Sequence, residues 1–386
     1  MRILVIHNFY QHAGGEDVVF HQEVNELQKN HEVHTLTFQN KKGWRGALQF
    51  LHYPWNFYAA RQVIKALKRD QPDIVHIHNL HYASGPAYIR SIHKRGIPIV
   101  MTLHNYRLLC PSASLFSDGQ IFTASVKSTF PWLAIKKRVL DHSLLKTTLT
   151  AWTYWLHRKF GTWDKVQTYV VLSSFAKSIF SQSTFPVADH KFTIRPNSIE
   201  LRPVKVEKLA KLVYIGRFSS EKGIIPLLEA IDGTGIALDI YGAGPQLEQV
   251  SRYVAANPTI RYLGYQPQAV LSKAIAQADA LVVPSVCYEG MPMTIIEAFA
   301  QGTPVLASAI GILKEMVLPL YTGMHFDPFD KNSVRTCLTD WVALDPAEKA
   351  KMAANCQAEY KQKYTLTKNM NLLVNIYQDA IQHAKK

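Results

Sequence analysis

The chain has 386 residues, of which 47% are hydrophobic and 19% charged, so it is long enough for two globular domains and ordinary in composition. No apolar run reaches the roughly 18 residues that a membrane-spanning helix needs. The first apolar run is interrupted at His7 and Asn8 and has no cleavage site, which favours a first strand over a signal peptide.

The positive charge is concentrated in the first half. Residues 1–202 carry 25 Lys+Arg against 12 Asp+Glu, whereas residues 203–386 carry 18 against 17. An anionic partner is therefore expected for the first half, and phospholipid, a lipid pyrophosphate and nucleic acid all qualify. A generally basic proteome is the alternative explanation. The four cysteines lie far apart without metal-ligand spacing, so free thiols in a reducing cytoplasm are expected.

Strands and helices alternate through the first half, which predicts a parallel sheet with right-handed crossovers. The predicted strands are 3–6, 32–37, 74–77, 97–103, 169–172 and 192–194, and the predicted helices are 17–27, 56–68 and 88–94.

Two positions in this half suggest a ligand site. Gly14 and Gly15 follow the first strand, where they let the backbone approach a ligand near a helix N-terminus, although Gly-Gly is also ordinary turn chemistry. His104 follows a strand, at the edge of the sheet where ligands bind in α/β proteins. A buried, hydrogen-bonded histidine is the simpler interpretation.

Residues 121–165 are less regular and mix aromatic with basic side chains. This composition suits a membrane interface, although core packing beside a solvated face explains it as well. The residues concerned are Phe130, Trp132, Trp152, Tyr154, Trp155 and Trp163, with Lys136, Lys137, Arg138, Arg158 and Lys159.

The second half opens with a strand followed by a loop that carries Arg217 and Lys222. Two cations at the carboxyl end of a strand can neutralise a diphosphate as it leaves, whereas a solvated loop would explain either one alone. The later stretch 240–245 has two glycines but lacks the third of a dinucleotide loop, so NAD binding is discounted.

Residues 279–309 form a predicted strand, loop, helix and strand. The helix is expected to start near Met291 or Pro292, which leaves Glu289 in the loop and Glu297 in the second helical turn. The N–H groups of Gly290 and Met291 then offer an anion site. Both acids could be merely solvated, but the apolar surroundings of Glu297 are a poor place for an unused charge.

Several stretches resemble family 4 (group 1) retaining glycosyltransferases of the GT-B superfamily. Residues 284–305 are similar to the donor-site signature of that family, and residues 216–223 to its Gly-Arg-x-x-x-x-Lys-Gly motif. Residues 104–111 are similar to its His-Asp-Tyr/Phe-Arg-Leu-x-Cys-Pro segment, with Asn105 where Asp is common. Residues 196–200 resemble its hinge, with Ser198 in place of Gly.

The resemblance implies roles for individual residues. Arg217 and Lys222 would bind the donor diphosphate, Glu289 the hexose and Glu297 the ribose, whereas Tyr265 and Gln266 would lie at the nucleobase. Catalytic roles fall to His104, Arg217, Lys222 and Glu289, and no nucleophile is evident. The donor set is Gly15, Gly216, Arg217, Lys222, Tyr265, Glu289, Gly290, Met291, Pro292 and Glu297, and the acceptor-side set is Gly14, Gly15, His104 and Arg107.

The resemblance also implies two Rossmann-like α/β domains facing across a cleft. Residues 1–202 would bind the acceptor, residues 203–362 the nucleotide sugar, and the helical residues 363–386 would cross back to the first domain. No Asp-x-Asp motif is present, so neither a metal nor a cofactor is expected.

The resemblance implies transfer of a hexose from a nucleotide-diphosphate sugar to an acceptor hydroxyl with retention, and the basic, aromatic first half favours a lipid-linked glycan in cell-surface polysaccharide synthesis over a small soluble acceptor. The expected location is the cytoplasm, with peripheral contact to the plasma membrane as a hypothesis. A nucleotide-sugar epimerase or phosphorylase of the same fold is one alternative. A basic nucleic-acid binding protein is another, although no nucleic-acid module is recognised. The nucleotide, the sugar, the linkage and the oligomeric state stay open.

Overall fold

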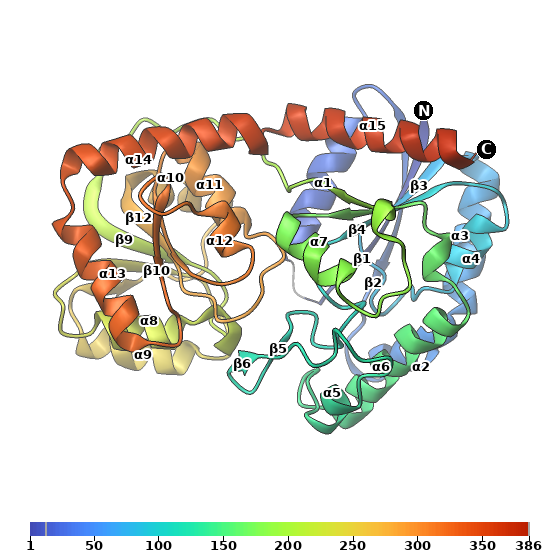
Figure 1. Ribbon diagram of the computed structural model, residues 1–386, viewed down its shortest axis with the longest axis horizontal. Helices are drawn as coiled ribbons and strands as arrows, with labels where there is room; N and C mark the ends of the chain where they lie inside the picture. Colours follow the sequence, from blue (N-terminus) through green and yellow to red (C-terminus); the bar gives the residue numbers. More distant parts are fainter. Residues whose placement is uncertain (12–13, 385–386) are drawn as a thin grey trace. The chain divides into compact units, whose positions relative to one another are not determined.

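The computed structural model describes residues 1–11 and 14–384 as two compact α/β units (Figure 1). Unit 1 comprises Met1–Ser117, Phe122–Asn197 and Leu366–Lys386, and unit 2 comprises Asp118–Ile121 and Ser198–Thr365. The division falls after Asn197, where the sequence predicted residue 202. No helix among the described residues is long and apolar enough to cross a membrane.

Unit 1 is built on a six-stranded parallel sheet, as predicted. The strand order β2-β1-β3-β4-β7-β8 reverses direction between β1 and β3, so the loops after these two strands diverge and leave a crevice where ligands bind in such sheets. The strands are β1 (Arg2–Phe9), β2 (Glu32–Gln39), β3 (Ile74–Ile77), β4 (Ile99–Leu103), β7 (Thr168–Val171) and β8 (Phe192–Ile194).

The predicted helices of unit 1 are present, and further ones appear. The predicted helices are α1 (Gly15–Leu27), α3 (Phe57–Asp70) and α4 (Tyr88–His93), and the additional ones are α2 (Gly43–His52), α5 (Trp132–Lys136), α6 (Leu144–Lys159) and α7 (Ser174–Ser181). Single turns lie at Tyr53–Trp55, Trp163–Lys165 and Asp189–Lys191, and β5 (Phe116–Ser117) pairs with β6 (Gln120–Ile121).

The regularity of α6 was missed because its buried face carries few aliphatic side chains. Thr147, Thr150 and Thr153 are fully buried along it, together with His157. The hydroxyls of Thr147 and Thr153 donate to the carbonyl oxygens of the preceding turn, which satisfies them inside the helix. A buried stripe of threonines does not produce the apolar period that marks a helix in sequence.

Unit 2 repeats the architecture with a sheet of order β11-β10-β9-β12-β13-β14, all parallel, whose direction reverses between β9 and β12. The strands are β9 (Leu209–Ile215), β10 (Leu238–Tyr241), β11 (Ile260–Tyr262), β12 (Ala278–Val283), β13 (Val305–Ser308) and β14 (Gly323–Phe326). The helices are α8 (Ile224–Ile231), α9 (Leu247–Ala256), α10 (Gln268–Gln277), α11 (Met293–Gln301), α12 (Leu313–Met316), α13 (Lys331–Ala343) and α14 (Pro346–Glu359), with single turns at Ser220–Lys222 and Tyr360–Tyr364.

The last helix, α15 (Leu366–Ala384), packs against the core of unit 1 (Figure 1). Its buried stripe includes Met370, Leu373 and Tyr377, which lie in one apolar cluster with Ile3 of β1 and Phe20 of α1. The chain thus returns to its first unit after completing the second. The four cysteines are buried and unbridged.

Candidate functional site

The predicted donor residues of unit 2 lie at the carboxyl ends of the strands where the sheet reverses direction. Gly216, Arg217 and Lys222 follow β9, and Glu289 follows the adjacent strand β12. Loops that start side by side and diverge are the usual ligand-binding position of an open α/β sheet. The sheet topology therefore gives the two sequence motifs a common location.

Lys222 and Glu289 form the strongest contact in this region. Lys222 Nζ lies 2.6 Å from Glu289 Oε1 and 2.9 Å from Oε2, and the hydroxyl of Ser285 donates to Oε1 at 2.6 Å. Burial alone would lower the pKa of Lys222, but the carboxylate of Glu289 outweighs it and raises that pKa above its usual value. The ammonium therefore stays charged at the strand ends.

Gly223 allows the two loops to meet. Its φ of +67° is a left-handed conformation, and a Cβ there would lie 1.9 Å from the carbonyl oxygen of Pro284. Next to it, the N–H of Val286 donates to the carbonyl of Glu221 at 3.0 Å. The glycine that follows Lys222 in the motif is therefore explained by the structure, because only glycine lets Lys222 approach the Glu289 loop so closely.

The turn at Gly242 and Gly244 packs closely against the loop that begins at Gly216. A Cβ at Gly242 would lie 1.9 Å from the carbonyl oxygen of Gly216, and one at Gly244 would lie 2.4 Å from that of Phe218. The N–H of Phe218 donates to the carbonyl of Ala243. These glycines therefore serve close packing of two loops, which accounts for them without a dinucleotide.

Arg217 and Tyr265 are exposed, in contrast to Lys222. Tyr265 is 82% exposed, and within residues 1–11 and 14–384 no carboxylate forms an ion pair with Arg217. The structure thus places Arg217 on the same loop as Lys222 without joining it to Glu289. The predicted roles of Arg217 at the donor diphosphate and of Tyr265 at the nucleobase therefore stay predictions.

Glu297 lies in the second turn of α11 and is only 6% exposed. Burial raises its pKa to about 7, and a hydrogen bond with Gln268 opposes part of this shift. The predicted helix start at Met291 or Pro292 was wrong by one or two residues. Pro292 has ψ 117° and is the N-cap, so the helix begins at Met293, and Gly290 and Met291 lie in the preceding loop.

The remaining predicted residues, Gly14, Gly15, His104 and Arg107, lie in unit 1. Gly14 caps α1, and its N–H donates to Asp17 Oδ2 at 2.9 Å. Its backbone is extended and a Cβ would meet no atom within 4 Å, so the protein itself does not require glycine at position 14. Close approach of a ligand there stays a prediction.

Glu16 was not predicted, although it directly follows the glycine pair. Asn79, just after β3, donates to Glu16 Oε1 at 2.8 Å and also to the carbonyl of Asn8. Burial, reinforced by the charge of Asp17, raises the pKa of Glu16 to about 8. A carboxyl with so perturbed a pKa, where the sheet reverses direction, is a candidate functional group. Its signal in the sequence is an acid at the helix start after the first strand.

His104 lines a pocket of about 310 Å³ with His78, Asn79 and Arg107. Its Nε2 lies 3.1 Å from Nδ1 of His78, and the two rings are nearly parallel, with an interplanar angle of 19°. Burial lowers the pKa of His104 well below its usual value, so the ring is neutral. Asn105 accepts a hydrogen bond from the N–H of Arg107. An Asp oxygen can accept the same bond, so Asn105 preserves this contact.

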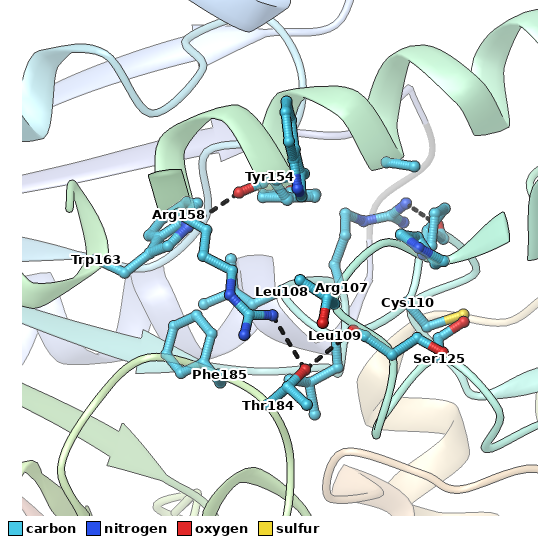
Figure 2. Close-up of a pocket in the computed structure, with 16 residues that line it drawn as sticks. Arg107, Leu108, Leu109, Cys110, Ser125, Tyr154, Arg158, Trp163, Thr184 and Phe185 are labelled. Carbon is cyan, nitrogen blue, oxygen red and sulfur yellow. Dashed lines mark hydrogen bonds between the residues drawn. The ribbon is translucent and has the colours of Figure 1, made fainter. Parts of the chain in front are cut away.

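Arg107 also lines a second pocket, of about 450 Å³ including space open to solvent (Figure 2). Figure 2 shows Arg158 of α6 reaching Thr184, to which its Nη1 donates at 3.0 Å. The side chain of Arg107 donates to the carbonyl of Pro111. Among residues 1–11 and 14–384, neither guanidinium forms an ion pair with a carboxylate within 4 Å, although the charge of Arg107 opposes part of the rise in the pKa of Glu16. Together with Tyr154 and Trp163, they give the pocket an aromatic and cationic lining.

Glu23, His76 and His78 are close enough to hold a metal ion, since one ligand atom of each lies within 4.8 Å of the others. However, both ring nitrogens of His76 already bond hydroxyls, those of Thr102 at 2.8 Å and Tyr377 at 2.7 Å. Arg195 pairs with Glu23 and neutralises its charge. A cation would have to disrupt these bonds, so the cluster fits a metal poorly.

Comparison with known proteins gives matches to both units. The family model described as "Glycosyltransferase Family 4" matches residues 13–202, and "Glycosyl transferases group 1" matches residues 199–359. An uncharacterized glycosyltransferase of Methanocaldococcus jannaschii, MJ1607, is 28% identical over 189 residues, which are 47% of this chain and 48% of that protein. The chain spans about half the length of the curated relatives it matches.

Two solved structures show the same fold over nearly the whole chain. Sucrose-phosphate synthase from Thermosynechococcus elongatus has a TM-score of 0.74 at 16% identity and covers 99% of this chain and 100% of its own. Anabaena Alr3699/HepE in complex with UDP has a TM-score of 0.70 at 14% identity and covers 98% and 100%. At such identities the likeness concerns the fold alone.

Proposed function

This chain belongs to the group 1 glycosyltransferases and has the GT-B fold, and from that premise we propose that it moves a hexose from a nucleotide-diphosphate sugar to an acceptor hydroxyl with retention. The observation that carries the proposal is the Lys222–Glu289 contact in unit 2. It joins the two sequence motifs at the edge of the sheet where ligands bind.

The chemistry follows from charge development in the transition state. As the bond from the anomeric carbon to phosphate breaks, negative charge grows on the diphosphate, and the Lys222 ammonium and the Arg217 guanidinium stabilise it. The acceptor hydroxyl forms the new bond on the face that the diphosphate leaves, and its proton departs with the leaving group. Glu289 holds a hexose hydroxyl and keeps Lys222 oriented.

The nucleotide is best sought among the uridine, guanosine and adenosine diphosphates. Glu297 would accept the ribose hydroxyls, and Tyr265 and Gln266 would lie at the base. The fold likeness to a chain in complex with UDP makes UDP the first candidate. Thermal-shift measurements with UDP, GDP and ADP sugars test this choice: one class should raise the melting temperature, and no shift with any of them counts against a nucleotide donor.

The acceptor is expected to bind unit 1 and to carry negative charge. Arg107 and Arg158 line its larger pocket and form no ion pair with a carboxylate among the described residues, and aromatic side chains beside them suit a sugar ring. An acceptor that combines sugars with phosphate, such as a lipid-linked glycan, fits this lining. Product analysis with and without such an acceptor is the decisive assay, because an epimerase needs no acceptor.

We also propose that unit 1 rests on an anionic phospholipid surface. Apolar side chains are exposed on α2, on the start of α3, and on α5 and α6, and the turn Tyr53–Trp55 packs against both α2 and α6. Exposed basic residues accompany them, so apolar and electrostatic attraction act together. The exposed apolar residues are Trp44, Leu48, Leu51, Phe57, Tyr58, Trp132, Leu133, Leu144, Leu145 and Trp152, and the basic ones are Lys41, Lys42, Arg45, Lys136 and Lys137.

Liposome flotation tests this surface. Binding to vesicles containing anionic phospholipid, weakening with salt, is the expected result. If the protein stays unbound at low salt, the membrane proposal is wrong, while the transfer reaction is tested separately.

A further inference from the structure

A chain of four polar side chains runs from the smaller pocket of unit 1 into its core. His104 Nε2 lies 3.1 Å from His78 Nδ1, and His78 Nε2 lies 3.3 Å from Glu23 Oε2. The other carboxylate oxygen, Oε1, accepts a hydrogen bond from Arg195 Nη2. His78, Glu23 and Arg195 are at most 2% exposed, so water does not compete for these bonds.

Arg195 can only donate hydrogen bonds, and this fixes which of the other groups donate and which accept. Burial alone would raise the pKa of Glu23, but the charge of Arg195 lowers it well below its usual value, so both oxygens of Glu23 accept. In the part of the chain that the structure describes, neither Glu23 Oε2 nor His78 Nε2 forms a hydrogen bond, but these two buried atoms face each other at 3.3 Å, where a carboxylate oxygen and an unprotonated ring nitrogen would repel each other. His78 must therefore carry its proton on Nε2.

The protonation of His78 in turn determines which nitrogen of His104 carries a proton. Arg195 already balances the single carboxylate, so a charged His78 would leave an uncompensated positive charge in a buried site. A neutral imidazole that donates through Nε2 accepts through Nδ1. His104 must then donate through Nε2, which leaves its own Nδ1 with a lone pair.

We propose that Glu23 and His78 are positioning residues that hold His104 in the Nε2–H tautomer, so that His104 presents Nδ1 as a hydrogen-bond acceptor for a substrate hydroxyl. The identity of that hydroxyl, on the sugar or the acceptor, rests on the proposed function. The tautomer does not, because it follows from the contacts within unit 1. A ligand group that can only accept, such as a carbonyl or a phosphate oxygen, gains no bond from this nitrogen.

Glu23→Gln should reverse the direction of the hydrogen bonds that link residue 23, His78 and His104. Arg195 needs an acceptor, so the amide oxygen takes the place beside it and the amide NH2 turns toward His78. His78 Nε2 must then accept, its Nδ1 must donate, and His104 must accept through Nε2. His104 is thereby forced into the Nδ1–H tautomer and offers the substrate a donor in place of an acceptor.

The first test reads the tautomer directly by NMR of the full-length protein with nitrogen-15-labelled histidine. His104 is assigned by the signals lost in His104→Gln. The wild type should show an unprotonated Nδ1, and Glu23→Gln should show the two nitrogen shifts exchanged. Tyr377→Phe is the matched control, because it removes a hydroxyl from His76 in the same buried cluster and leaves the chain to His104 intact.

The second readout is transfer kinetics. The kcat/KM of Glu23→Gln should fall about 10- to 100-fold, the range for orienting residues behind a functional group, while Tyr377→Phe stays within about twofold. Should Glu23→Gln fail to fold, His78→Phe serves instead. It keeps the Arg195–Glu23 pair and should leave His104 without a fixed tautomer.

Unchanged His104 signals in Glu23→Gln, or in His78→Phe, overturn the positioning role. Exchanged signals with full transfer activity overturn the role of Nδ1 as acceptor for substrate. If the wild type transfers no sugar, but the two nitrogen shifts of His104 are exchanged in Glu23→Gln, the proposed function is refuted and the tautomer assignment stands.

Discussion

The two units each place charged side chains at the carboxyl ends of a six-stranded parallel sheet, but they hold those charges differently. In unit 2, Lys222 and Glu289 meet through two surface loops that Gly223 allows to touch. In unit 1, the His104 chain ends on Glu23 and Arg195, which are buried between α1 and the strand end after β8.

This difference separates two ways of building a site. The unit 2 contact depends on backbone shape within two short motifs, and its charges are partly buried, with side chains 31% exposed for Lys222 and 11% for Glu289. The unit 1 chain depends on long-range packing, since Arg195 also donates to the backbone carbonyl of Asn369 on α15. Variants in unit 2 should therefore affect activity and local stability, whereas variants in the unit 1 chain should affect activity through proton placement.

Lys222→Ala should have the largest effect. Removing the ammonium takes away a charge that stabilises the leaving diphosphate, and losses of about 10²–10³-fold in kcat are typical for one such donor. Steady-state kinetics with the nucleotide sugar measures it. Lys211→Ala is the matched control, because Lys211 pairs with Asp239 in the same unit, away from the motifs, and its loss should leave kcat unchanged. A full rate for Lys222→Ala would remove the basis of the leaving-group argument.

Gly223→Ala should destabilise unit 2 by about 3 kcal/mol or more. The left-handed backbone costs roughly 1–2 kcal/mol for a residue with a Cβ, and the clash with Pro284 adds to that. Gly233→Ala separates the two costs, because Gly233 has φ +71° with no atom within 4 Å of a Cβ, so only the backbone term applies. Urea denaturation measures both. Equal losses in the two variants would show that the loops need no close approach.

The comparison also explains how much of the molecule was predictable from its sequence. The contact between the two unit 2 loops follows from local sequence, because Lys222 and Glu289 lie in contiguous motifs and Gly223 lets the loops approach, whereas the donor-binding roles of these residues stay predictions. Most strands could be predicted as well, because buried parallel strands are continuous apolar runs.

The unit 1 chain could not be predicted in the same way. Glu23 sits on an amphipathic helix, where an acid is expected to be solvated, and Arg195 lies 172 residues further along. Their partnership depends on packing that no local pattern encodes. The helices α2 and α6 were missed for related reasons, since one exposes its apolar side chains and the other buries threonines.

Glu297→Gln should change the pH dependence of stability by up to about 3 kcal/mol. Folding raises the pKa of Glu297 from 4.5 to about 7, so the folded state binds more protons between these values. The free energy of unfolding therefore falls as the pH rises through this window. Glutamine does not ionise, so the variant should not lose stability in this window and should be more stable than wild type at pH 8. It should also bind nucleotide more weakly.

Denaturation at pH 5 and pH 8 measures the effect as a difference between variant and wild type, which cancels the parallel contribution expected from Glu16 in unit 1. An identical pH dependence in both proteins would mean that Glu297 is hydrated in the folded state.

Lys42→Ala should have the smallest effect, and it asks whether the basic charge of unit 1 acts on a membrane. Lys42 is exposed just before α2, which begins at Gly43 and exposes Trp44. A basic residue near an anionic bilayer contributes about 1 kcal/mol, so partitioning onto anionic vesicles should weaken about fivefold, with transfer to a soluble acceptor unchanged. Lys273→Ala, at an exposed position on α10 of unit 2, should leave partitioning unaffected. Equal weakening in both variants would mean that net charge, and not a surface of unit 1, attracts the protein to the vesicles.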